Sequence, residues 1–239
     1  NEVGTVQPLD AIAEVVRERA PQAAIHSDAV QAMPWVDVAF AAAAADLVAV
    51  SAHKFGGPKG VGALVVRGVA ANRLQPVTDG GGQERGLRSG TVNVAGIVGM
   101  AAAMRCLEEH RDAEVARARV LRDRLAAGIL ARPELGAEIN GDQARRIAGN
   151  LNLYFPGTEA DSLLLMLDRE GVCAASGSAC QSGSMDPSHV LMAMGFDVRH
   201  ALSSIRLSLG WCSTDAEVDE TLAVLPRVVE QLQARAATR

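Results

Sequence analysis

Two continuous apolar runs, separated by a loop rich in glycine and proline, place the strongest constraint on the fold of this chain. Residues 46–52 read DLVAVSA and residues 62–67 read GALVVR. Apolar runs without alternating polar residues are typical of strands that are covered on both faces. A short amphipathic helix, expected before Pro21, and a strand-like run at 23–29 precede them. This order of one helix and three strands predicts an α/β layer.

The second half of the chain has a different pattern. The segment from Ala95 to Ala131 consists mostly of strong helix formers and contains no proline, which predicts one long helix, with a break near His110 as the alternative. The alternating run at 151–155 predicts a strand. A last helix near the end of the chain is expected to be kinked or interrupted at Pro226. We therefore expect two domains, an α/β domain at residues 1–110 and an α+β domain at residues 111–239.

The composition excludes several classes of protein. A chain of 239 residues with 49% hydrophobic residues and a mean hydropathy of +0.11 can bury one or two cores and is not disordered. No apolar stretch reaches the roughly 18 residues that a membrane-spanning helix needs. A net charge of −5 without a basic cluster argues against a nucleic-acid partner. The chain begins at Asn1, directly in a turn-like segment, so we expect that it is a fragment.

The four cysteines lack the spacing of a zinc site, and no signal peptide precedes them, so we expect no resident metal and reduced thiols in a cytoplasm. Cys180 lies in a run of small residues at 174–184, which predicts a mobile loop with a reactive thiol. Cys106 lies in a helical apolar pattern. Cys173 and Cys212 border apolar residues and are expected to be buried and inert.

A lysine follows the first apolar run, in the segment SAHKFGGPKG at residues 51–60. This position predicts that Lys54 lies at the carboxyl edge of the sheet, where α/β folds bind ligands. A neutral ε-amine there can form a Schiff base with an aldehyde, and Ser51 and His53 could hold a phosphate. The alternative is that Lys54 and Lys59 are exposed loop lysines and that His53 is a hydrogen-bonded core residue.

Asp28 ends the strand-like run that precedes the lysine segment. In a parallel sheet, its carboxylate would lie at the same edge as Lys54. There it could pair with the protonated pyridine nitrogen of pyridoxal 5′-phosphate (PLP) and make the ring a better electron sink. Gln31 could then bond the 3′ oxygen of the ring. By itself, Asp28 is equally well explained as a helix N-cap.

The glycine-rich segment from Gly80 to Thr91 contains two arginines and many backbone N–H groups, which makes it a candidate anion cradle. The alternative is a surface loop in which Arg85 and Arg88 pair with acidic neighbours.

Five motifs together give a more specific pattern than any one of them. Their order and spacing resemble the NifS-like cysteine desulfurases of the class-V aminotransferase family, over essentially the whole chain. The motifs are Asn1–Gly4, Asp28–Gln31, Ser51–Lys54, Gly80–Thr91 and Ser176–Cys180.

The resemblance implies a PLP-dependent transferase of fold type I, with a partial large α/β domain and a small α+β C-terminal domain. Residues 1–110 would be the C-terminal part of the large, PLP-binding domain, and residues 111–239 the small domain that carries the cysteine loop. The implied reaction takes sulfur from L-cysteine, releases L-alanine and leaves a persulfide on Cys180. Cys180 would also be the residue that contacts a transferred iron–sulfur cluster.

By their places in the motifs, Lys54 resembles the Schiff-base lysine and Asp28 the partner of the pyridine nitrogen. Asn1 and Gln31 resemble the contacts on the side of the 3′ oxygen. We also expect Lys54 to take the Cα proton of the substrate.

The phosphate of PLP would be bound by Ser51 and His53. Thr91 resembles a residue that family members lend to the phosphate of the neighbouring subunit, so the resemblance implies a homodimer. Arg206 resembles the arginine that clamps the substrate carboxylate, and its planar fork suits that role. Outside this match, Arg206 could be an ordinary strand arginine paired with an acid.

The expected partners are L-cysteine and a sulfur acceptor, either an iron–sulfur scaffold protein or a tRNA thiouridylase. Family members contain an N-terminal segment that this chain lacks. We therefore expect the 239-residue chain alone to be inactive or poorly folded, and the full-length protein to be a desulfurase.

Three other functions share parts of this pattern. A selenocysteine lyase or another PLP-dependent carbon–sulfur lyase would also use Lys54 and Asp28, and one that releases sulfide directly would keep its rate in a Cys180→Ser variant. An aminotransferase of the same fold would yield a keto acid and not alanine. A non-catalytic interaction module would bind a partner without any cofactor.

Overall fold

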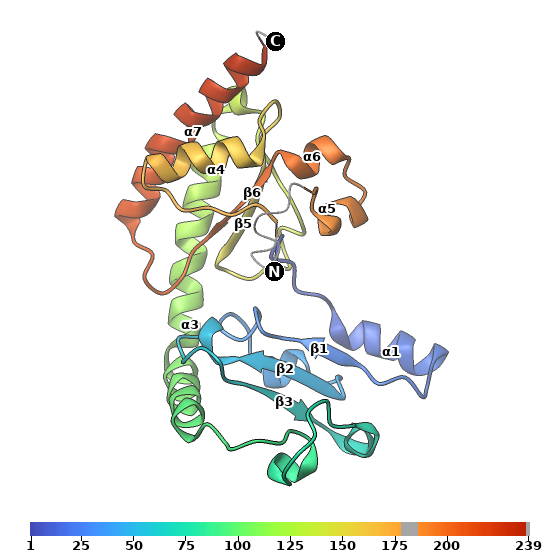
Figure 1. Ribbon diagram of the computed structural model, residues 1–239. Helices are drawn as coiled ribbons and strands as arrows, with labels where there is room; N and C mark the ends of the chain where they lie inside the picture. Colours follow the sequence, from blue (N-terminus) through green and yellow to red (C-terminus); the bar gives the residue numbers. More distant parts are fainter. Residues whose placement is uncertain (178–185, 238–239) are drawn as a thin grey trace. The chain divides into compact units, whose positions relative to one another are not determined.

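The computed structural model describes residues 1–177 and 186–237 (Figure 1). Within them the chain forms two compact units. We call residues 7–111 the lysine unit, and residues 1–6 together with the chain from residue 112 onward the arginine unit. This division lies next to the boundary at 110/111 expected from the sequence.

Residues 1–6 differ from the expected assignment, because they pack with the arginine unit. The reason is a pair of backbone hydrogen bonds to a distant part of the sequence. The Val6 N–H donates to Arg145 O at 2.8 Å, and the Ile147 N–H donates to Gly4 O at 2.9 Å.

The lysine unit is built on a three-stranded sheet with the order β1-β2-β3. Strand β1 (His26–Asp28) runs parallel to β2 (Leu47–Ser51), and β3 (Gly62–Val66) runs antiparallel to β2. The strands expected from the sequence are therefore confirmed, with β1 shorter than its apolar run. Helix α1 (Leu9–Arg19) confirms the amphipathic helix.

Short helices complete the lysine unit, together with the first part of α3 (Val94–Leu130). Its core consists of small and medium apolar side chains from α1, β1, β2 and α3, including Ala13, Ile25, Val48, Val50, Ala52, Phe55 and Met100. The short helices are α2 (Val38–Ala41), η1 (Ala52–Lys54), η2 (Gly68–Arg73) and η3 (Gln83–Gly86).

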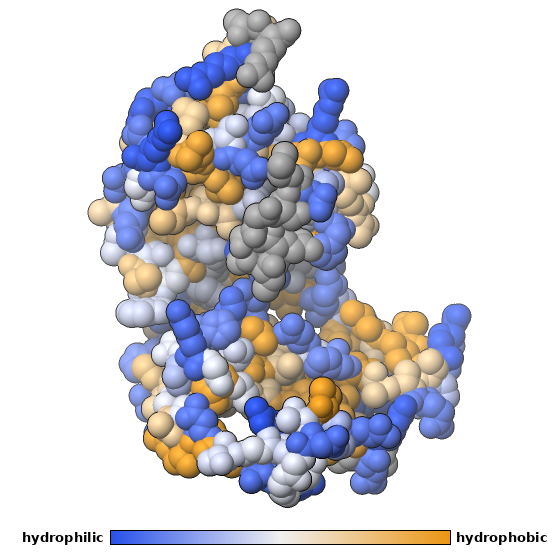
Figure 2. Space-filling model, in the orientation of Figure 1, coloured by the Kyte–Doolittle hydropathy of each residue, from blue (hydrophilic) through white to orange (hydrophobic). Residues whose placement is uncertain are grey.

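Strand β3 is not covered on both faces, contrary to the expectation from its apolar run. Leu64 and Val65, which point to opposite faces, are 48% and 46% exposed. None of residues 62–66 belongs to the buried core, because that core is built on β1 and β2 and on the helices beside them. Apolar side chains therefore remain at the surface of the lysine unit, where Figure 2 shows orange patches.

The arginine unit contains a second, antiparallel sheet with the order β4-β5-β6. The strands are β4 (Glu138–Ile139), β5 (Asn150–Tyr154) and β6 (Ser204–Ser208), and Asn152 lies opposite Arg206. Leu151 and Leu153 point into a large core shared with the helices of the unit. The strand predicted at 151–155 is confirmed.

The helices of the arginine unit include α4 (Ala160–Arg169), α5 (His189–Ala193), α6 (Val198–Leu202) and α7 (Asp215–Ala237), with the short η4 at Pro133–Leu135. Helix α7 continues through Pro226, so the expected interruption is wrong. Pro226 is buried, as are its neighbours Leu225, Val228 and Val229 in the core, which stabilises the helix on both sides of the missing N–H.

Helix α3 confirms the long helix expected from the sequence. It runs for 37 residues from Val94 to Leu130 without a break. Met100 belongs to the core of the lysine unit, whereas Leu121, Leu125 and Ile129 belong to the core of the arginine unit. One helix therefore supplies side chains to both cores.

The expectation of buried thiols is wrong for Cys173 and Cys212. Both are exposed and free, as is Cys106, because Cys173 lies in the loop after α4 and Cys212 in the turn before α7. Among the described helices, none is both long and apolar enough to cross a membrane.

Candidate functional site

A tight turn after β2 fixes the backbone of Lys54. Residues 52–54 form η1, and the N–H groups of Phe55 and Gly57 donate to the carbonyl of Ala52 at 3.0 and 2.9 Å. Ala52 and Phe55 bury their side chains in the core. A Cβ at Gly57 would lie 2.9 Å from Cβ of Ala52, so a larger residue does not fit there. Lys54 is therefore held by buried neighbours while it remains half-buried itself.

Polar side chains lie at the carboxyl ends of the two parallel strands, as the sequence predicts. Asp28 ends β1 and Ser51 ends β2, with Asp28 opposite Ala49 in the register. Ser51 Oγ lies 2.8 Å from His53 Nδ1, and Asp28 Oδ1 accepts the Val30 N–H at 3.0 Å. Asp28 and His53 are exposed. This edge thus presents a carboxylate, a hydroxyl, an imidazole and an amine to solvent.

Two further predicted residues belong to the lysine unit. Gln31 is half-buried in the turn that follows β1, and Thr91 is exposed after the glycine-rich loop. The roles assigned to both residues stay predictions from the sequence.

The glycine-rich loop has an unusual backbone. Glu84 and Arg85 adopt left-handed conformations, with φ of 49° and 60°, which L-residues rarely do. Ser89 is buried, and its hydroxyl donates to Gly81 O at 2.6 Å. Arg85 and Arg88 form no ion pair within the described part of the chain. The alternative of a loop held by arginine–acid pairs is therefore not supported.

Arg206 occupies a closed site on β6 of the arginine unit. It is 8% exposed, and its Nη1 donates to Asn1 Oδ1 at 3.0 Å. Its Nε is buried and has no hydrogen-bond partner among the described residues. Burial lowers the pKa of the Arg206 guanidinium, and the negative charge of Glu2 offsets part of that shift. A buried, charged guanidinium with an unused donor is suited to binding a carboxylate.

Asn1 and Arg206 are the two predicted site residues that the structure brings into contact. Residues 1–6 form a strap across the β4-β5-β6 sheet, and the expected contact of Asn1 on the side of the 3′ oxygen stays a prediction. Gly4 permits this strap, because its φ is +78° and a Cβ there would lie 2.9 Å from Asn150.

Sequence reasoning missed a set of buried polar residues beside Arg206. Glu2 is 3% exposed, and its carbonyl accepts the side-chain amides of Asn150 and Asn152 at 3.2 and 3.1 Å. The alternation in β5 could have pointed to a polar face, but that pattern normally indicates contact with water. Here the strap covers it.

Cys180 lies outside the described residues, so its expected role stays a prediction from the sequence. Among the residues that the structure does describe, no three metal-ligating side chains are grouped as a metal site.

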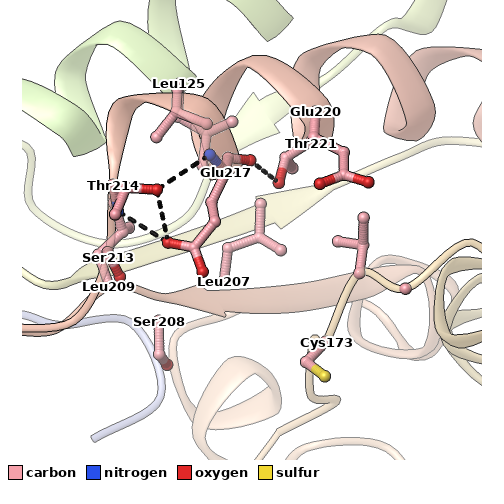
Figure 3. Close-up of a pocket in the computed structure, with 13 residues that line it drawn as sticks. Leu125, Cys173, Leu207, Ser208, Leu209, Ser213, Thr214, Glu217, Glu220 and Thr221 are labelled. Atoms are coloured by element: carbon pink, nitrogen blue, oxygen red, sulfur yellow. Dashed lines mark hydrogen bonds between the residues drawn. The ribbon is translucent and has the colours of Figure 1, made fainter.

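A separate cavity of about 230 Å³ lies in the arginine unit (Figure 3). Cys173, Leu207 and Leu209 line it, together with Thr214 and Glu217 at the start of α7. Thr214 and Glu217 form a reciprocal capping box, in which the Thr214 N–H donates to Glu217 Oε2 at 2.7 Å. None of the predicted site residues that the structure describes lines this cavity. Its polar residues Thr214 and Glu217 cap the first turn of α7.

His200 has a structural environment, as its apolar sequence context suggests. Its ring stacks on Tyr154 and Phe196 at centroid distances of 3.9 and 4.0 Å, and its Nε2 lies 2.7 Å from Asn140 Oδ1. Burial lowers its pKa.

Comparison with known proteins decides the family. A family profile described as "Aminotransferase class-V" matches residues 1–221. The chain belongs to the class-V aminotransferase family. This confirms the family resemblance and the α/β fold class inferred from the sequence.

Within this family, the chain is similar to proteins that are named cysteine desulfurases. It is 44% identical over 234 residues to "Cysteine desulfurase IscS" of Clostridium botulinum strain Hall, covering 97% of this chain and 57% of that protein. It is also 44% identical over 229 residues to "IscS-like cysteine desulfurase" of Mycobacterium tuberculosis, covering 96% and 57%. The chain thus spans a little over half the length of these relatives.

Solved structures show the same fold. A "NIFS-LIKE PROTEIN" matches with a TM-score of 0.81 and 35% identity, over 98% of this chain and 59% of that one. The NifS-like protein from Rickettsia africae matches with a TM-score of 0.85 and 27% identity, over 96% and 59%.

Proposed function

We propose that the intact protein is a PLP-dependent cysteine desulfurase that converts L-cysteine to L-alanine and a persulfide on Cys180. The observation that carries the proposal is the lysine segment at the sheet edge. There the backbone of Lys54 is fixed by Ala52 and Phe55, in a family whose named relatives are desulfurases.

The donor set at this edge fits the proposed cofactor. Ser51 and His53 would bind the phosphate, Asp28 would pair with the pyridine nitrogen, and Gln31 would bond the 3′ oxygen. Lys54 would hold the aldehyde through its ε-amine. When bound, PLP would supply an electron sink for the charge that develops at the substrate Cα. The mixture of one carboxylate with hydroxyl, imidazole and amine donors matches a group that has both a pyridine nitrogen and a phosphate.

Four residues of the chain would each have a separate role in the reaction. Arg206 would bind the carboxylate of L-cysteine, because its guanidinium is buried and its Nε is without a protein partner in the described chain. Asn1 would orient that guanidinium through the bond from Nη1. Lys54 would take the Cα proton. Cys180, as a thiolate, would accept the sulfur.

Several finer assignments belong to the same proposal. The protein would act as a homodimer, with Thr91 completing the neighbouring subunit's phosphate site. It would pass sulfur to an iron–sulfur scaffold protein or to a tRNA thiouridylase. Its three exposed free thiols fit a cytoplasm, where cysteines are kept reduced.

The decisive experiment follows the transferred sulfur. The intact protein is incubated with L-cysteine, and mass spectrometry locates any added sulfur. We expect a persulfide on Cys180, none in the Cys180→Ser variant, and unchanged transfer in the matched Cys173→Ser control. Sulfide release that survives Cys180→Ser would identify a direct carbon–sulfur lyase. A keto-acid product would identify an aminotransferase.

A further inference from the structure

Glu2 is a buried carboxylate for which the proposed reaction has no use so far. It is 3% exposed and belongs to the strap, whose backbone is held by Asn150 and Asn152 of β5. Burying a charge is costly unless it is paired or hydrogen-bonded. A charge kept at such a position therefore calls for a physical explanation.

The carboxylate of Glu2 lies between the two ends of one chain segment. At one end, the Ser188 hydroxyl donates to Glu2 Oε2. At the other end lies Gly177, where a Cβ would be 3.7 Å from Glu2 Oε2 and 3.9 Å from Ser188 Cβ. Residues 177 and 188 are thus neighbours in space, and Glu2, which accepts the Ser188 hydrogen bond, lies beside both.

Both ends of the segment are also fixed to regular structure. Ser188 is the N-cap of α5, and its Oγ accepts the Leu191 N–H at 3.2 Å. Before Gly177, Ala175 pairs with Arg206 in an isolated antiparallel bridge, with bonds of 3.0 and 2.6 Å. The bridge joins this end directly to the strand that carries the carboxylate-binding arginine.

Glu2 also acts on the charge of Arg206. Its negative charge raises the pKa of the guanidinium against the effect of burial. No ion pair between the two residues is formed within the described structure, so the interaction is one of nearby charges and not of direct contact. Arg206 is thereby left with donors for a ligand.

We propose that Glu2 is a positioning residue that holds Ser188, the C-terminal flank of the Cys180-bearing segment, next to Gly177 and beside Arg206. This inference rests on the proposed desulfurase function. Glu2 contacts neither the reacting atoms nor the substrate in this scheme. It acts through Ser188 and through the charge of Arg206, and it sets where the sulfur acceptor is tethered relative to the bound cysteine.

The test compares Glu2→Gln, Ser188→Ala and the double variant in the intact, cofactor-loaded protein. In Glu2→Gln, kcat for alanine release and the rate of persulfide formation should fall by about tenfold, because the charge-assisted hydrogen bond from Ser188 becomes a weaker, neutral one. KM for L-cysteine should not rise, because removing a negative charge near Arg206 favours the substrate carboxylate. The cofactor absorbance should be unchanged.

Ser188→Ala should lower kcat similarly and leave KM unchanged, because the charge of Glu2 is retained. The double variant should be no slower than the slower single variant, since Glu2→Gln weakens the same hydrogen bond that Ser188→Ala removes. Glu134→Gln, which neutralises an exposed glutamate of the same unit, should match the unmodified protein.

The outcomes separate two failures. If the unmodified protein forms no persulfide on Cys180, the proposed function fails. If it does, and both Glu2→Gln and Ser188→Ala keep their kcat or raise KM with kcat unchanged, only the role of Glu2 is refuted. If Glu2→Gln does not fold, Ser188→Ala alone tests the role of Glu2. A lower kcat with unchanged KM supports this role, and an unchanged kcat refutes it.

Discussion

The surroundings of Arg206 in the arginine unit are closed by the chain itself, whereas the strand edge beside Lys54 in the lysine unit is open. Around Arg206, the strap supplies Asn1 and Glu2, and the guanidinium is 8% exposed. At the other edge, Asp28 and His53 are exposed, and β3 leaves apolar side chains uncovered. Within this chain, the proposed place for a substrate carboxylate is therefore more completely formed than the proposed place for a cofactor.

The largest effect is expected at the open edge. Lys54→Ala in the intact protein should lower alanine release by about a thousandfold, because it removes both the group that holds the cofactor and the proposed base. Borohydride reduction followed by peptide mapping should find the cofactor on Lys54. The matched variant Lys59→Ala, in the same loop, should keep activity and trapping. Trapping on another side chain would contradict the assignment.

A pair of leucines tests the difference in closure directly. Leu153→Ala, at 0% exposure in the arginine unit, should lower the free energy of unfolding by about 2–5 kcal/mol. Leu64→Ala, at 48% exposure on β3, should cost less than about 1 kcal/mol. Urea unfolding of the intact protein measures both. Equal losses would show that β3 is as well covered as β5, and the comparison would fail.

The smallest effect concerns pH in the closed unit. Burial lowers the pKa of His200, so the folded state keeps it neutral while the unfolded state binds a proton below about pH 6.5. The free energy of unfolding should therefore fall as the pH drops through that range. His200→Gln should reduce this dependence, and His189→Gln, at an exposed site, should not. An unchanged slope in His200→Gln would exclude the stacked imidazole as its source.

Local pattern was sufficient for most of the fold. The apolar runs at 46–52 and 62–67 predicted β2 and β3, and the helix formers from Ala95 predicted the long helix α3. The edge position of Asp28 and Lys54 also followed, because parallel strands bring their carboxyl ends together. These features depend on residues close in sequence or on a simple topological rule.

Contacts between distant segments explain what the sequence did not reveal. The strap pairs residues 4–6 with residues 145–147, and nothing in six residues indicates a partner that far away. Glu2 and Asn152 were missed for the same reason, since their burial depends on that pairing. Exposure was misjudged for Cys173 because neighbouring apolar residues do not determine which way a loop side chain points.

Helix α3 has a thermodynamic consequence for the whole chain. Its 37 residues place Met100 in one core and Ile129 in the other. When one core unfolds, the part of the helix that belongs to it loses its packing, and this loss also destabilises the rest of the helix. Heat-induced loss of the two parts should thus be cooperative, and calorimetry should record one merged transition in place of two.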